Sequence, residues 1–274
     1  MTAQGSEPAR AAPEVGRPRW LAALTGAGVG LLGGLVGLGG AEFRLPLLIG
    51  LFGFAALQAV IVNKAMSLIV VLVAIPSRLL AVPLTQITSH WTVVVNLLAG
   101  SLAGAWLGAS WATRMRASTL YRVLAVLLVG IAAVFAAEHV GAIHALGLSS
   151  VPRAAVGLIA GFGIGVVAAI MGVAGGELLI PTIVLLFGVD TKLAGSLSLL
   201  VSLPTMLVAF FRYSRDQAFT VLGQHPRFIM AMAGGSILGT FVGGLLLGAV
   251  SEAILVPLII GLLLFSSVKV WRHA

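Results

Sequence analysis

Long apolar runs dominate this chain and leave few kinds of structure open to it. Of its 274 residues, 59% are hydrophobic and only 9% are charged, which is too few polar side chains to cover a water-soluble globule. In each half of the chain, three runs are long enough to cross the ~30 Å hydrocarbon core of a bilayer as helices. These runs cover residues 57–80, 91–111, 119–138, 193–213, 227–248 and 252–271. The pattern predicts an all-α polytopic membrane protein that spans the cell membrane several times.

The second half of the chain repeats the first half at an offset of 135 residues. Glu42 aligns with Glu177 and Pro46 with Pro181, and the same register holds for glycines over some eighty positions. The aligned glycines of the first half are Gly26, Gly28, Gly30, Gly53, Gly100, Gly104 and Gly108. We therefore predict repeat 1 over residues 19–140 and repeat 2 over residues 153–274, joined by a linker at 141–152. Residues 1–18 are polar and contain proline, which predicts a disordered cytoplasmic tail.

Each repeat opens with an apolar segment that is too long for one crossing. Residues 21–53 would form a helix of ~50 Å, but the segment is interrupted at 37–42 and again at Pro46. Its second part, residues 43–54, is too short to span the bilayer comfortably. Residues 154–172 and 177–188 repeat this pattern. We therefore predict a broken-helix hairpin, followed by three transmembrane helices, in each repeat.

The distribution of positive charge favours inverted repeats over parallel ones. If the hairpin enters and leaves on one side, the repeats are inverted; if its broken piece makes one crossing, they are parallel. With the N-terminus in the cytoplasm, the inverted scheme places most Lys and Arg residues inside, as the positive-inside rule expects. The net charge of +8 then reflects membrane topology, and the clusters between apolar runs argue against binding to nucleic acid.

The glycine-rich breaks are the predicted substrate site. Glycine allows the backbone to turn, and a helix that starts just after the break directs free N–H groups toward an anion. The candidates at the two tips are Gly39, Gly40, Ala41, Gly175 and Gly176. The alternative is that these glycines only serve helix packing.

Two acids at equivalent positions follow the breaks. Glu42 and Glu177 are predicted to carry a coupling proton, because an ionisable side chain inside the membrane is costly and indicates function. The alternative is that each acid only caps the start of its helix. Arg44 is not expected to neutralise Glu42, because residues two apart do not face each other on a helix.

Polar residues inside the third run of each repeat complete the predicted site. Lys64 is a candidate counter-charge for an anion, with Asn63 beside it; the alternative is a lysine that snorkels to the surface. Ser196 and Ser198 lie in the equivalent run of repeat 2. Serines in membrane helices commonly bond to their own or a neighbouring helix, so each serine alone is weak evidence.

No residue pattern indicates an enzyme. The Gly28-x-Gly30-x-x-Gly33 spacing lies inside a membrane run and opens no βαβ unit, and no histidine is placed to activate Ser110. The chain lacks cysteine, and no His or acidic cluster has the spacing of metal ligands. We predict no cofactor and no metal. Glycines four residues apart, as at 100, 104 and 108, predict close helix packing.

The doubled break resembles that of the TauE/SafE family, also called the sulfite exporter or toluene-sulfonate uptake permease family. The segments that carry the resemblance are Gly33–Gly40 with Pro46, and Met171–Gly176 with Pro181. An element typical of the family is present at residues 193–198, whereas residues 58–68 lack its glycine and contain Lys64. The resemblance covers residues 20–272. It implies a secondary transporter of small, often sulfur-containing anions, such as sulfite or organosulfonates.

The predicted function is therefore anion transport, as an exporter or a permease, by alternating access around the two breaks. An anion channel and a membrane assembly subunit without coupled transport are the alternatives. The expected partners are the anionic substrate and the lipid bilayer, and the sequence leaves open whether the protein forms a homodimer.

Overall fold

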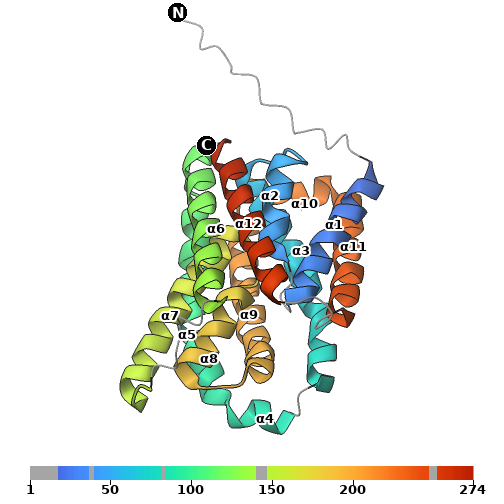
Figure 1. Ribbon diagram of the computed structural model, residues 1–274. Helices are drawn as coiled ribbons and strands as arrows, with labels where there is room; N and C mark the ends of the chain where they lie inside the picture. The colour runs from blue at the N-terminus through green and yellow to red at the C-terminus, as the bar shows by residue number, and fades with distance from the viewer. Residues whose placement is uncertain (1–17, 37–39, 82–83, 140–146, 247–251, 274) are drawn as a thin grey trace, which may run out of the picture.

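The computed structural model describes residues 18–36, 40–81, 84–139, 147–246 and 252–273. Within these ranges the regular elements are helices and no strand occurs, which confirms the predicted all-α class (Figure 1). Of the predicted tail, all but Pro18 lies outside the described residues, and so do residues 141–146 of the predicted linker. The boundaries of tail, repeats and linker stay predictions.

Both repeats contain the same series of helices. Repeat 1 consists of α1 (Arg19–Val36), α2 (Ala41–Gly50), α3 (Ala56–Ala81), α4 (Leu84–Ser89), α5 (Trp91–Ala112) and α6 (Ala117–His139). Repeat 2 consists of α7 (Ser150–Met171), α8 (Gly176–Phe187), α9 (Thr191–Tyr213), η1 (Gln217–Thr220), α10 (Val221–Gln224), α11 (Pro226–Leu245) and α12 (Glu252–Trp271). The short α4, η1 and α10 were not predicted. By the 135-residue offset α4 corresponds to residues 219–224, so these short helices belong to the repeat as well.

Six of the described helices are long and apolar enough to cross a membrane. They contain the segments Ala56–Val73, Trp91–Ala112, Ala117–Ala137, Ser150–Met171, Thr191–Tyr213 and Pro226–Leu245. Shorter apolar segments lie in α1, α8 and α12. The prediction of a polytopic membrane protein is confirmed.

The predicted second interruption at Pro46 is wrong. Helices α2 and α8 continue through Pro46 and Pro181, each in the sixth position of its helix. Proline lacks the N–H that would bond to the carbonyl four residues earlier, which belongs to Glu42 in α2 and to Glu177 in α8. Each helix therefore loses one hydrogen bond near its start but continues as one helix.

Glycine seams join each repeat to the other repeat. A Cβ atom on Gly30 of α1 would lie 2.9 Å from the Cα of Ser236 in α11, and one on Gly165 of α7 would lie 2.8 Å from the Cα of Ser101 in α5. These pairs are related by the 135-residue offset. The predicted packing role of the glycines spaced four residues apart is confirmed. Along both seams the residue numbers increase together, so α1 is parallel to α11 and α5 is parallel to α7.

The end of α12 marks one end of the molecule. The side chain of Lys269 lies against Gly50 at the end of α2, and the rings of His273 and Tyr121 are 6.0 Å apart. Tyr121 lies at the start of α6. This end is called the basic end because it carries Arg19, Arg114, Arg116, Arg122, Arg212, Arg215, Arg227, Lys269 and Arg272.

The direction of the helices relative to the basic end shows that the repeats are inverted. Phe228, at the start of α11, packs on Phe52 just after α2, so α11 and its parallel partner α1 run away from the basic end. Helix α5 ends shortly before α6 starts at the basic end, so α5 and its parallel partner α7 run toward it. Helices α1 and α7 are equivalent in the two repeats and point in opposite directions (Figure 1). The inverted arrangement is confirmed.

Candidate functional site

The two predicted tips start helices α2 and α8 near mid-depth of the bundle. Gly40 and Gly175 precede these helices with φ of 67° and 87°, a left-handed conformation that suits glycine. Gly40 lies against Val29, halfway along α1. Ala41 and Gly176 are the first residues of the two helices, as predicted for the tips, whereas Gly39 lies outside the described residues.

The two acids at equivalent positions of the repeats are brought together. Glu42 is fully buried and Glu177 is 4% exposed, and their carboxyl groups lie close enough to interact. Neither oxygen of Glu42, and not Oε2 of Glu177, has a hydrogen-bond partner among the residues that the structure describes. Coupling and capping therefore stay predictions for both acids.

Lys64 and Asn63 bind the tip of the opposite repeat. The Lys64 ammonium donates to the carbonyl oxygens of Ala168 at 2.8 Å and Val173 at 2.6 Å. The Asn63 amide donates to the carbonyl of Met171 at 3.2 Å. These carbonyls belong to the last turn of α7 and the segment just after it, where the helix dipole is negative. The fully buried Lys64 does not snorkel to the surface.

Asn63 also connects the two tips. Its amide donates to the carbonyl of Ala41 at the start of α2, at 3.0 Å, besides its bond to α7. Ser67, one turn further along α3, donates to the carbonyl of Gly172 at 3.4 Å. Helix α3 thus holds both breaks in one place.

Arg44 is a site residue that sequence reasoning missed. Its fully buried guanidinium donates to Oδ1 of Asn63 and to Oγ of Ser67, both at 3.5 Å, and it interacts electrostatically with Glu42. The rule that residues two apart do not face each other considers only one helix surface, so it does not predict the contacts of Arg44 with Asn63 and Ser67 of α3. The available signal was the arginine two residues after Glu42. The equivalent position of repeat 2 holds leucine, Leu179.

The two predicted serines are buried in α9 and form no hydrogen bond with the residues described above. Ser198 donates to the carbonyl of Gly195 in its own helix at 2.8 Å. Ser196, like Ser202, has a buried hydroxyl with no hydrogen-bond partner in the described part of the chain. By the repeat offset, Ser198 and Ser202 occupy the positions of Asn63 and Ser67.

The central cluster is the name used below for six buried side chains from both repeats. They are Glu42, Arg44, Asn63, Lys64, Ser67 and Glu177. Both cations come from repeat 1, because Leu179 and Leu199 stand at the equivalent positions of repeat 2. With two acids and two cations the cluster can be neutral as it stands, and it can accept an anion when a proton is also bound.

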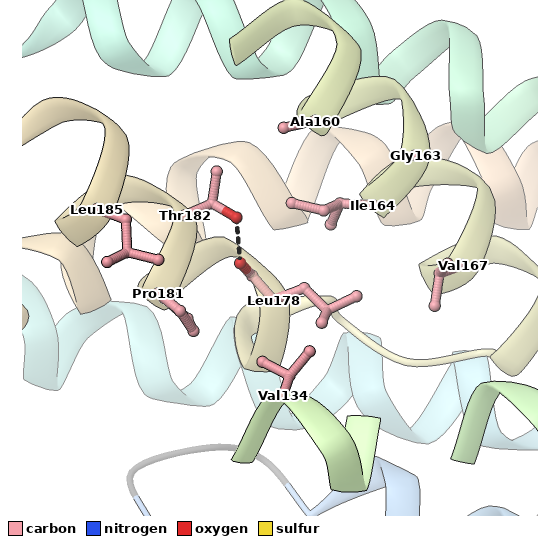
Figure 2. Close-up of a pocket in the computed structure, with 9 residues that line it drawn as sticks. All are labelled: Val134, Ala160, Gly163, Ile164, Val167, Leu178, Pro181, Thr182 and Leu185. Atoms are coloured by element: carbon pink, nitrogen blue, oxygen red, sulfur yellow. Dashed lines mark hydrogen bonds between the residues drawn. The ribbon is translucent and has the colours of Figure 1, made fainter. Parts of the chain in front are cut away.

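A separate pocket of about 430 Å³ lies between α6, α7 and α8, as Figure 2 shows. Aliphatic residues such as Val134, Ile164 and Leu178 line it, and the hydroxyl of Thr182 is already bonded to the carbonyl of Leu178 at 2.7 Å. No charged side chain is among its lining residues. This pocket suits hydrocarbon and does not suit a small anion.

Fold and site together define a polytopic membrane protein built from two inverted repeats, whose paired half-helices meet at a buried charged cluster. The Sulfite exporter TauE/SafE family matches residues 2–135 and again residues 136–270. The chain belongs to this family, and the resemblance inferred from the doubled break is confirmed. Membership implies a membrane transporter of sulfur-containing anions and not an enzyme. The comparison with curated proteins gave no match, and neither did the comparison with solved structures.

Proposed function

We propose that this protein is a secondary transporter of small anions, such as sulfite or organosulfonates, that works by alternating access around the two breaks. The observation that carries the proposal is the meeting of two half-helix starts and four buried charged side chains near mid-depth. Broken helices of inverted repeats that meet in this way form the ion sites of many carriers. We place the protein in the cell membrane with its basic end in the cytoplasm, in line with the positive-inside rule.

The substrate anion is held at the cluster by positive groups that are already inside the membrane. Lys64 and Arg44 supply two cations, and the free N–H groups at the starts of α2 and α8 face the same region. In the described conformation the Lys64 ammonium is bonded to carbonyl groups. Substrate binding therefore exchanges these carbonyls for the anion, and the tip of repeat 2 is released.

Glu42 and Glu177 carry the coupling proton. Two adjacent carboxylates in a buried, weakly polar site repel each other, and a shared proton removes that repulsion. The proton also leaves the two cations with excess positive charge, which favours an anion. Proton and anion thus bind together, and their charges cross the membrane as a neutral pair.

Two observations bear on the alternatives. The complete burial of Glu42 and Lys64 favours a carrier over a channel, because an open pore would expose them to water. Tight packing around Gly172, where a Cβ would lie 3.3 Å from the Lys64 amide nitrogen, would also fit an assembly subunit. Membership in a transporter family favours transport.

The test is uptake into proteoliposomes, with sulfite, thiosulfate and sulfoacetate as substrates, in the presence and absence of a pH gradient. We expect Glu42→Gln and Glu177→Gln, singly and together, to abolish the stimulation by the gradient. Asp190→Asn serves as the control, because it removes an acid that is exposed at the start of α9. If the double variant retains transport with the wild-type pH dependence, the coupling role is wrong. Single-channel currents far above the turnover of a carrier would show a channel instead.

A further inference from the structure

Two arginines at the end of α9 share one tryptophan ring of α5. The guanidinium carbons of Arg212 and Arg215 lie 5.9 Å and 5.8 Å from the centre of the Trp106 ring, and Arg215 lies 4.8 Å from that of Phe211. The Arg212 Nε donates to the Ser110 hydroxyl at 2.8 Å, which ties α9 to α5. The four side chains of Trp106, Phe211, Arg212 and Arg215 are called the α5–α9 patch.

The two cations of the patch lack a counter-ion among the residues that the structure describes. Neither Arg212 nor Arg215 forms an ion pair with any residue that the structure describes. The nearest acid in sequence, Asp216, accepts the amide N–H of Ala218 at 2.9 Å and begins η1. Two guanidinium groups without a carboxylate, side by side on one indole, form a site for an external anion.

The patch is expected at the depth of the lipid head groups, because it lies near the ends of two candidate membrane spans. It lies where α5 and α9 end, at the basic end, and both helices contain candidate membrane spans. Trp106 is 41% exposed and Phe211 56% exposed, as expected for aromatic residues at a membrane–water interface. One turn deeper along α9, Leu207 is 49% exposed and extends the apolar surface from Phe211 toward the membrane interior.

We propose that the α5–α9 patch binds an anionic phospholipid. The lipid phosphate is held by Arg212 and Arg215, whose planar groups match phosphate oxygens, and an acyl chain follows Phe211 and Leu207. A lipid fits better than free phosphate because exposed apolar side chains continue directly from the two cations. This site is separate from the central cluster, and it does not depend on the proposed transport function.

The test uses the full chain in detergent and native mass spectrometry with phosphatidylglycerol and, separately, phosphatidylethanolamine. We expect tighter binding of phosphatidylglycerol. Because a basic residue near a membrane surface contributes about fivefold to such binding, Arg212→Gln with Arg215→Gln should weaken it about 30-fold. Binding of phosphatidylethanolamine should stay the same.

Two further variants keep the result interpretable. Arg116→Gln with Arg227→Gln removes the same charge from exposed positions at the same end and should leave binding near the wild-type value. Arg215→Gln alone breaks no hydrogen bond in the described chain and should weaken binding about fivefold. The proposal is overturned if the control pair weakens binding as much as the patch pair, if both lipids bind equally, or if inorganic phosphate displaces the lipid at millimolar concentration.

Discussion

Replacement of Gly30 by alanine should loosen the seam between α1 and α11. The added Cβ would lie 2.8 Å from the carbonyl carbon and 2.9 Å from the Cα of Ser236, and closer still to its carbonyl oxygen. These are backbone atoms of a helix, so no side chain can rotate away. Ordinary contact begins near 3.4 Å, and the two helices must therefore separate by at least about half an ångström.

The expected cost follows from two opposing effects. Overpacking of this kind costs about 1–3 kcal/mol, and alanine in place of glycine stabilises a helix by up to about 1 kcal/mol. The net free energy of unfolding should fall by about 1–2 kcal/mol, which corresponds to about 2–4 °C in melting temperature for each kcal/mol.

The control lies two residues away on the same helix. A Cβ on Gly28 would meet no atom within 4 Å, so Gly28→Ala makes the same chemical change without the clash and should be neutral or slightly stabilising. Melting temperatures of both variants are measured in detergent by circular dichroism. The pair Gly165→Ala and Gly163→Ala repeats the test at the equivalent seam, because Gly163 also has open space. Equal melting temperatures for Gly30→Ala and Gly28→Ala would refute the reasoning.

Two other changes probe the ends of helices. Lys64→Leu copies Leu199 and leaves the buried carbonyl of Val173 without a donor, whereas the carbonyl of Ala168 keeps the backbone N–H of Val173. It should cost about 1–3 kcal/mol of stability and abolish uptake, and an unchanged melting temperature would contradict this. The backbone N–H of Lys192, and then that of Leu193, hold the pKa of the Asp190 carboxyl below its ordinary value. The contribution of Asp190 to stability is therefore complete above its unfolded-state pKa and is lost as the pH falls through the folded-state pKa. Asp190→Asn should melt with a weaker dependence on acid pH than the wild type, and parallel melting curves from pH 7 to about pH 3 would argue against this cap.

Most of the features that can be predicted from the sequence are predicted by the internal repeat. A constant offset identifies equivalent positions, so Glu42 and Glu177 can be paired from the order of residues alone. The glycines four residues apart also predict close packing directly, because the absence of a side chain is itself the property that the contact needs. These features depend on local spacing and on symmetry, and both can be read from one chain.

The partners of the polar residues cannot be predicted in the same way. Lys64 and Asn63 are evident candidates, but the acceptors that join them to the tip of the other repeat lie about a hundred residues away. The helical neighbour rule misses the role of Arg44, because it says nothing of contacts to a second helix such as that with Ser67 of α3. The prediction of a break at Pro46 does not consider where the residue lies. It is near the start of its helix, where the loss of one hydrogen bond is tolerated.

The exchange of helices between the two repeats has a consequence for assembly and ancestry. Since each seam joins a helix of one half to a helix of the other, neither half can cover its own glycine faces. Because α1 and α5 precede α11 and α7 in the chain, their glycine faces are synthesised before the helices that cover them. A chain of half this length could build the same seams only by pairing two copies inserted in opposite orientations. Fusion of the two copies removes that requirement, because one polypeptide then guarantees equal numbers of both orientations.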